Sequence, residues 1–241
     1  MPRKRKPVAL EAYEKLAGPY AALVDEKVEN AYYEMPATLS LLPHVAGMHV
    51  LDAGCGTGRY TEWLLDHGAE VVGVDVSPRM IRHARKRVGK RAEFHVADLG
   101  KPLDFLGGLR FDLVLAALIL DYIEDWEPLF AEFNRVLKGF GLLVFSCGHP
   151  FSDYTQHPGA DYFATEYVEH TWRGFGVPVV VPSYRRPIGS ILSGLVGAGF
   201  ALEKLVEPRA GEEVRKRDPD AYEKRYRLPG FMAIRARKRT G

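Results

Sequence analysis

The chain has 241 residues, of which 46% are apolar, and its formal net charge is +2. This length is enough to bury one sizeable core. The nearly balanced charge argues against a protein whose main task is to grip a nucleic-acid backbone. Cys55 and Cys147 have no metal-ligand spacing, no apolar run is long enough to span a membrane, and no signal peptide precedes the first predicted element. We therefore expect a soluble, cytoplasmic α/β protein with reduced thiols and no bound metal.

The first 44 residues predict a helical cap ahead of a sheet. Apolar residues recur at helical spacing between Ala9 and Leu23. The dipeptide Gly18-Pro19 should divide this stretch into two short helices, because the residue before a proline avoids the helical region. Another helix is expected over 36–42. Four tyrosines of the cap either pack it against the core or form an aromatic lid over a cationic ligand, and these are Tyr13, Tyr20, Tyr32 and Tyr33.

A buried strand at His49–Leu51 leads into the glycine-rich stretch 52–58, and a helix is expected over 60–65. Glycines allow sharp backbone turns and close approach of a ligand. Three of them at alternate positions after a strand predict a loop wrapped around a small molecule. A dinucleotide-binding loop would have its third glycine where this chain has Arg59, so the spacing argues against a nicotinamide-dependent dehydrogenase.

A second buried strand, Val71–Asp75, ends in a carboxylate that can accept hydrogen bonds from both hydroxyls of a ribose. Ser77 is the expected N-cap of a helix over 78–88, with Pro78 as its first residue. Within that helix, Met80 either packs on an adenine ring or belongs to the core.

Strands and helices continue to alternate after this unit. Strands are predicted at 93–97, 111–117 and 141–147, and a helix at 128–137 that ends at Lys138-Gly139. The first of these strands is followed by Asp98-Leu99, and the second by Leu118–Tyr122. This alternation predicts right-handed crossovers between parallel strands.

The pattern breaks in a segment rich in aromatic residues at about 148–186, directly after the fifth strand. Ligands of open α/β sheets bind beyond the carboxyl ends of the strands, so we expect this segment to form a substrate lid. A helix at 188–196, a strand at 200–207, a charged connection at 208–228 and a last strand at 230–236 complete the chain.

Residues 52–58 resemble the first motif of the class I S-adenosylmethionine-dependent methyltransferases, and Asp75 resembles their second. Asp98 matches the third motif, which binds the adenine amino group, and 118–122 the fourth, which ends near the transferred methyl. The resemblance implies a Rossmann-like, doubly wound sheet of seven strands. It also implies that the last strand is antiparallel and lies between the fifth and the sixth. We expect a cap over 1–44 and a cofactor-binding domain over 45–241.

The resemblance also implies the cofactor, S-adenosylmethionine, with S-adenosylhomocysteine as product, and an N-terminal helix whose tyrosines cover it. The predicted cofactor contacts are Tyr13, Tyr20, Tyr33, Asp52, Gly54, Gly56, Asp75, Val76, Met80, Asp98, Leu99 and Leu118. The predicted substrate contacts are Tyr122, Tyr154, Trp172, Tyr184 and Arg186. His149 is the candidate general base, because a histidine can take a proton near neutral pH. Its alternative role is a turn residue before Pro150 with local hydrogen bonds.

The favoured function is methyl transfer to a small molecule by a monomer or homodimer that needs no nucleic acid or membrane. Methylation of RNA or of another macromolecule is an alternative. However, amino-group methyltransferases of nucleic acids usually have an Asn/Asp-Pro-Pro-Tyr stretch where this chain has Leu118-Ile-Leu-Asp121. A non-catalytic protein that binds S-adenosylmethionine is the other alternative, although the aromatic lid argues against it.

Overall fold

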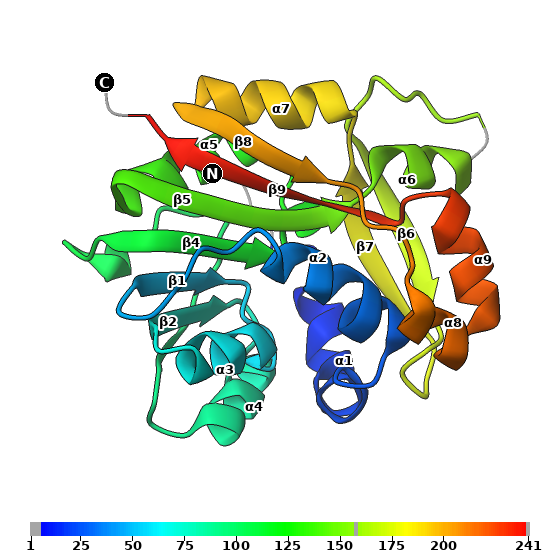
Figure 1. Ribbon diagram of the computed structural model, residues 1–241, viewed down its shortest axis with the longest axis horizontal. Helices are drawn as coiled ribbons and strands as arrows, with labels where there is room; N and C mark the ends of the chain where they lie inside the picture. The colour runs from blue at the N-terminus through cyan, green and yellow to red at the C-terminus, as the bar shows by residue number, and fades with distance from the viewer. Residues whose placement is uncertain (1–5, 157–158, 240–241) are drawn as a thin grey trace.

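The computed structural model describes residues 6–156 and 159–239. Its centre is a seven-stranded sheet in the order β3-β2-β1-β4-β5-β9-β8, in which β9 runs antiparallel to the other six strands (Figure 1). This confirms the predicted fold class and the insertion of the last strand beside the fifth. The strands are β1 (His49–Ala53), β2 (Glu70–Asp75), β3 (Glu93–Val96), β4 (Phe111–Ala117), β5 (Leu137–Gly148), β8 (Phe200–Val206) and β9 (Phe231–Lys238).

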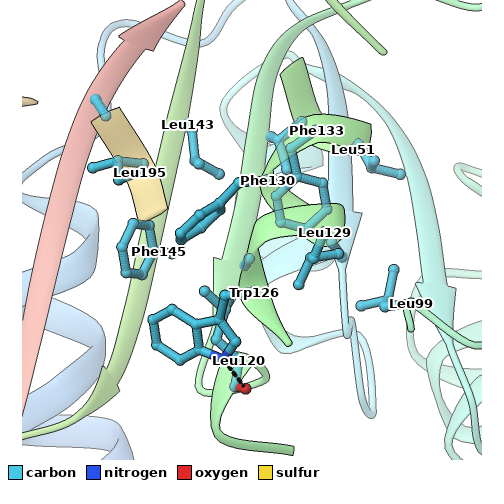
Figure 2. Packing of buried hydrophobic residues seen from close by; sticks show 14 of the residues in the cluster. Leu51, Leu99, Leu120, Trp126, Leu129, Phe130, Phe133, Leu143, Phe145 and Leu195 are labelled. Carbon is cyan, nitrogen blue, oxygen red and sulfur yellow. Dashed lines mark hydrogen bonds between the residues drawn. The ribbon is translucent and has the colours of Figure 1, made fainter. Parts of the chain in front are cut away.

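Neighbouring side chains of a strand point to opposite faces of the sheet, and here both faces are buried under helices. Val114 and Ala116 of β4 belong to one apolar cluster, and Leu113 and Leu115 to the other. The first cluster is covered by α5 (Trp126–Val136) and α7 (Ile188–Gly197), and Figure 2 shows their packing. In that cluster the indole N–H of Trp126 donates to the Leu120 carbonyl at 2.8 Å. The opposite face is covered by α2 (Met35–Leu39), α3 (Arg59–Asp66) and α4 (Pro78–Val88).

The N-terminal segment differs from the prediction in two ways. α1 (Leu10–Leu23) runs through Pro19 without a break, so the expected division at Gly18-Pro19 is wrong. Its buried face packs on α4 and on the strand β7 (Val179–Arg185), and these tertiary contacts outweigh the local preference against proline inside a helix. Before α2 the chain forms a π-helix, η1 (Glu29–Glu34), which apolar periodicity did not predict.

The aromatic segment at about 148–186 contains the helix α6 (Pro150–Gln156) and a two-stranded antiparallel hairpin, β6 (Glu166–Trp172) and β7 (Val179–Arg185). In Figure 1 the arrowheads of β4 and β5 point toward the side that the hairpin and α6 occupy. The charged connection predicted at 208–228 contains two helices, α8 (Glu212–Arg217) and α9 (Pro219–Arg227), on the same side. The predicted division into cap, domain and lid stays a prediction.

The remaining elements are two short 3₁₀ helices, η2 (Asp104–Leu106) and η3 (Leu120–Tyr122). The predicted boundaries of α4 and β4 agree with the structure, and the Ser77 hydroxyl caps α4 by accepting from the Met80 N–H at 3.1 Å. α5 ends at Val136, close to the expected stop at Lys138-Gly139, but β5 begins directly at Leu137 and not at 141 as predicted. Within the described ranges, no helix has the length and apolar character needed to cross a bilayer.

Candidate functional site

A cavity of about 480 Å³ lies at the carboxyl ends of the central strands, and this volume is typical of small-molecule sites. One part, which we call the strand-loop end, is lined by Gly54, Gly56, Asp75, Val76, Met80, Asp98 and Leu99. The other part, the hairpin end, is lined by Gly148, Ser152, Trp172, Phe175, Val181, Ser183, Tyr184, Arg225, Gly230 and Phe231. The wall also includes the last residue of β4 and most of the turn after it, where the sheet order reverses between β1 and β4; these residues are Ala117, Leu118, Ile119, Asp121, Tyr122 and Ile123.

The glycine-rich loop between β1 and α3 has a backbone that side chains rarely adopt. Gly54, Gly56 and Gly58 have φ angles of 81°, 54° and 82°. A Cβ on Gly56 would meet no protein atom within 4 Å, and this residue lines the cavity. A Cβ on Gly58 would lie 3.0 Å from the backbone Cα of Ala84, so this glycine lets α3 approach α4. The loop thus presents bare backbone to a ligand on one side and packs tightly on the other.

Asp75 is fixed at the end of β2 by two backbone N–H groups. Its Oδ2 accepts from Gly56 at 3.0 Å, and its Oδ1 accepts from Ser77 at 2.8 Å. The residue is 8% exposed and lines the cavity. Burial raises the pKa of this carboxyl to about 6, although the two backbone bonds pull the pKa down. Each carboxylate oxygen has a further lone pair, so Asp75 can still accept hydroxyl donors.

Asp52 and Tyr33 were predicted to contact the cofactor, but the structure does not place them on the cavity wall. The Asp52 carboxylate lies beneath the glycine loop and accepts from the Thr61 hydroxyl at 2.5 Å. Burial raises the pKa of Asp52 to about 7. The Tyr33 hydroxyl donates to the Pro208 carbonyl and accepts from the Gly230 N–H, both at 2.9 Å. Both side chains hold the backbone around the cavity.

Of the four tyrosines of the predicted aromatic lid, two reach the cavity wall. Tyr13 and Tyr20 of α1 line the cavity, and the Tyr13 and Tyr122 hydroxyls share a hydrogen bond of 2.7 Å. The ring of Tyr20 stacks on Phe175, with 5.1 Å between the ring centroids, and Tyr13 meets Trp172 edge-on. Burial raises the pKa values of Tyr13, Tyr20 and Tyr122, so all three phenols are protonated near neutral pH.

The end of β4 is tied to the π-helix by a buried network. Leu118 has a φ of 52°, and its N–H donates to the carbonyl and hydroxyl oxygens of Ser146. The Ser146 hydroxyl donates to Glu34 of η1 at 2.6 Å, and Thr38 and Tyr60 donate to the same carboxylate. Burial raises the pKa of Glu34 despite these bonds. π-Helical turns are frequent at functional sites, and here one is linked through Ser146 to Leu118, which lines the cavity.

Three of the five predicted substrate contacts, Tyr122, Trp172 and Tyr184, line the cavity. Tyr154 lies off its wall, is 40% exposed and meets the ring of Tyr162 edge-on. Arg186 also lies off the wall. Its guanidinium sits 4.2 Å from the ring centroid of Trp126 and donates to the Ile123 carbonyl at 2.7 Å. Arg186 therefore holds the turn after η3 and does not face a ligand.

His149 is buried at the start of α6 and does not line the cavity. Its Nδ1 accepts from the Phe151 N–H at 3.2 Å, so Nε2 carries the proton and donates to Glu207 at 2.7 Å. Both ring nitrogens are thus engaged away from the site. The geometry favours the alternative interpretation, a turn residue with local hydrogen bonds, over a general base.

The sequence did not single out several polar or charged residues that line the cavity. These are Lys27, Glu29, Asn30, Asp121, Ser152, His170, Arg173, Ser183 and Arg225. The aromatic composition of 148–186 indicated that this segment covers a ligand, but apolar periodicity did not indicate which polar residues face inward. For Arg225 the sequence offered no signal, because it lies in a run of charges typical of a solvated surface.

Comparison with known proteins agrees with this geometry. Residues 51–145 match the family model described as a methyltransferase domain. A solved S-adenosylmethionine-dependent methyltransferase from Mesorhizobium loti is 30% identical with a TM-score of 0.71, and the match covers 89% of this chain and 100% of that one. A malonyl-[acyl-carrier protein] O-methyltransferase of Enterobacter lignolyticus (strain SCF1) is 29% identical over 72% of this chain, which spans 64% of that relative. A demethylmenaquinone methyltransferase of Tropheryma whipplei (strain Twist) is 34% identical over 53% of each chain. The chain belongs to the S-adenosylmethionine-dependent methyltransferases.

Proposed function

We propose that this enzyme transfers the methyl group of S-adenosylmethionine to a small-molecule acceptor held at the hairpin end of the cavity. The observation that carries the proposal is the continuity of the cavity. One cavity joins the strand-loop end to the hairpin end, and Leu118, Ile119 and Tyr122 lie along it. A cofactor at the first end would therefore direct its reactive group toward a ligand at the second.

The strand-loop end fits the cofactor on two observations. The open space above Gly56 leaves room for a ligand against the backbone, and Asp75 presents a buried carboxylate fixed in the wall. We assign Asp75 to the ribose hydroxyls. We assign Asp98, whose Oδ2 also lies 2.8 Å from Lys101 Nζ, to the adenine. When bound, the cofactor supplies a methyl group made electrophilic by a sulfonium.

The chain's own contribution is to hold the acceptor in line and to exclude water. The rings of Tyr13 and Tyr20 form part of the wall, and aromatic faces attract a cation such as a sulfonium. The phenols of Tyr13 and Tyr122 are protonated and bonded to each other, so they can orient an acceptor by donating or accepting a hydrogen bond. We assign no general base, because His149 faces away from the cavity.

The activity of one relative supports a small acceptor, because demethylmenaquinone is a small molecule, whereas the malonyl group of the other relative's acceptor is carried by an acyl-carrier protein. The chain spans 64% and 53% of those relatives, so their acceptors are not transferred to it.

A labelling experiment tests the proposal. The purified protein is first titrated with S-adenosylhomocysteine by calorimetry. It is then incubated with S-adenosylmethionine carrying a tritiated methyl group and with bacterial extract separated into small molecules, RNA and protein. We expect saturable binding, with label entering the small-molecule fraction. Label confined to RNA or protein would contradict the small acceptor, and binding with no transfer to any fraction would favour a non-catalytic role.

A further inference from the structure

We propose that Arg225 forms an anion-binding subsite at the hairpin end, and that the methyl acceptor is a small aromatic carboxylic acid whose carboxylate binds this guanidinium. The inference deepens the proposed function and rests on it, because the ligand in question is the acceptor. Arg225 belongs to α9, more than 120 residues beyond the strand-loop end in sequence, and lines the cavity beside Ser152, Gly230 and Phe231.

Among the residues that the structure describes, the guanidinium of Arg225 is mostly buried but only weakly paired. Its side chain is 12% exposed. Nη1 donates to the Ser152 hydroxyl at 3.4 Å, and Nη2 lies 3.6 Å from the nearest Glu29 oxygen. A guanidinium has five N–H donors, and both contacts are longer than a good charge-assisted bond of about 2.8 Å. Burying a charge with such loose partners is unfavourable, and a carboxylate in the cavity would offset that cost.

The backbone beside Arg225 provides a fitted seat for the guanidinium. A Cβ on Gly230 would lie 2.6 Å from Arg225 Cζ, so the flat group rests against bare backbone. Two hydrogen bonds fix the backbone of Gly230. Its N–H donates to the Tyr33 hydroxyl at 2.9 Å, and its carbonyl oxygen accepts from the His149 N–H at 3.0 Å. Four segments of the chain therefore converge on the position of one charged group.

The neighbouring wall determines which acid fits. Trp172, Phe175 and Tyr122 present rings to the same cavity, which favours a flat, apolar body for the ligand. Lys27 and Arg173 also line the cavity, and the Lys27 ammonium lies 4.6 Å from the Phe175 ring centroid. The positive charges of Lys27, Arg173 and Arg225 favour an anion, whereas Glu29 and Asp121, which also line the cavity, disfavour a second negative charge on the ligand. A monoanionic carboxylate fits this balance better than a phosphate dianion, and a planar guanidinium can bind it through two parallel bonds.

Matched acids and amides test the charge requirement directly. The probes are benzoate with benzamide, phenylacetate with phenylacetamide, and indole acetate with indole acetamide. Their dissociation constants are measured by ligand-observed NMR titration, with and without saturating S-adenosylhomocysteine. For the wild type we expect at least one acid to bind about tenfold or more tightly than its amide, the scale of a hydrogen bond to a charged group. If no acid binds more tightly than its amide, the proposal is overturned.

Three variants test whether Arg225 causes the preference for acids over their amides. Arg225→Gln should remove it, while Arg227→Gln, an exposed arginine on the same helix, should keep it. Glu29→Gln should increase the preference by about threefold to tenfold, because it removes the carboxylate that competes for Arg225. A gain of this kind cannot come from a loss of folding. Equal preference in Arg225→Gln and wild type, or no gain in Glu29→Gln, would overturn the assignment.

The same measurements separate this proposal from the proposed function. S-adenosylhomocysteine affinity of Arg225→Gln should equal that of the wild type, because Arg225 lies at the hairpin end. If the wild type fails to bind S-adenosylhomocysteine but prefers acids through Arg225, the proposed function fails and the anion subsite stands. If it binds S-adenosylhomocysteine but shows no acid preference, the anion subsite fails and the proposed function stands.

Discussion

The two ends of the cavity are built in different ways. The strand-loop end comes from one continuous stretch, residues 54–99, in which successive strands of the sheet each deliver one short loop to the same edge. The hairpin end is assembled from segments that are far apart in sequence, which are the end of β5, α6, β6, β7, α9 and the start of β9. Its shape depends on tertiary packing between these segments, and no single stretch encodes it.

The two ends also differ in the kind of group that each presents to a ligand. Backbone groups and one fixed carboxylate dominate the strand-loop end, and these features suit a cofactor that does not vary. Aromatic rings and charged side chains dominate the hairpin end, where each can change without disturbing the sheet. A loss confined to one end should therefore leave ligand binding at the other intact.

The largest expected effect is at Gly56. Gly56→Val should abolish binding of S-adenosylhomocysteine, because a side chain there would occupy the space of the ligand and the φ of 54° disfavours any Cβ. Calorimetry measures the loss, and a cooperative thermal melt shows that the variant folds. Gly107→Val is the matched control, since Gly107 has a φ of 52°, no atoms within 4 Å of a Cβ, and a position away from the cavity. Normal binding by Gly56→Val would mean that the loop does not touch the cofactor.

Asp75→Ala should weaken S-adenosylhomocysteine binding by about 1.5–3 kcal/mol, the scale of hydrogen bonds to a charged group. The wild-type affinity should also depend on pH. Because the pKa of Asp75 is raised to about 6, the carboxylate is ionised above that pH and becomes protonated as the pH falls through it. Affinity should drop by about tenfold between about pH 7 and about pH 5 in calorimetry. Asp75→Ala should lack this drop, and a similar drop in the variant would assign it to another group.

The sequence predicted the strand-loop end well because its signals are local. A glycine spacing, a carboxylate at a strand end and a serine before a proline each depend on neighbours within a few residues. Seven of the twelve predicted cofactor contacts lie in that end, and Tyr13, Tyr20 and Leu118 also line the cavity. The sheet order followed from the family resemblance, since periodicity alone does not reveal which strands are adjacent.

The errors have physical causes that lie in tertiary structure. Packing of α1 on α4 overrode the local effect of Pro19. The π-helix depends on Glu34, whose partners Tyr60 and Ser146 are 26 and 112 residues away. Arg186 was predicted to contact the substrate, but its guanidinium packs on the ring of Trp126. The arginine of α9 that lines the cavity is Arg225.

Gly230→Ala tests the hairpin end, where it changes the backbone against which Arg225 rests. The added Cβ would lie 2.6 Å from Arg225 Cζ and should displace the guanidinium from its seat. We expect the preference for aromatic acids over their amides to fall by about tenfold, as in the loss of one charged hydrogen bond. S-Adenosylhomocysteine affinity, measured on the same sample, should not change. If the acid preference persists, the guanidinium does not need that seat.

The smallest effect on ligand binding is expected at Asp52, which lies beneath the strand-loop end and not on its wall. Its folded pKa of about 7 lies above its ordinary value of 3.8, so the protonated form favours the folded state. The stability that this group contributes is fully present below the ordinary pKa and is lost as pH rises through about 7.

Asp52→Asn keeps an oxygen to accept from the Thr61 hydroxyl but has no charge to bury. Its Tm should therefore exceed that of the wild type by a few degrees near about pH 8, and the difference should shrink toward about pH 5. Part of the pH dependence should remain, because burial also raises the pKa values of Glu34 and Asp75. Asp112→Asn is the control of opposite sign: Asp112 pairs with Lys138 at 2.8 Å and its pKa is lowered, so losing its charge should lower Tm at neutral pH. Scanning calorimetry at several pH values measures both variants, and an unchanged Tm profile in Asp52→Asn would show that this carboxyl is not held in a desolvated site.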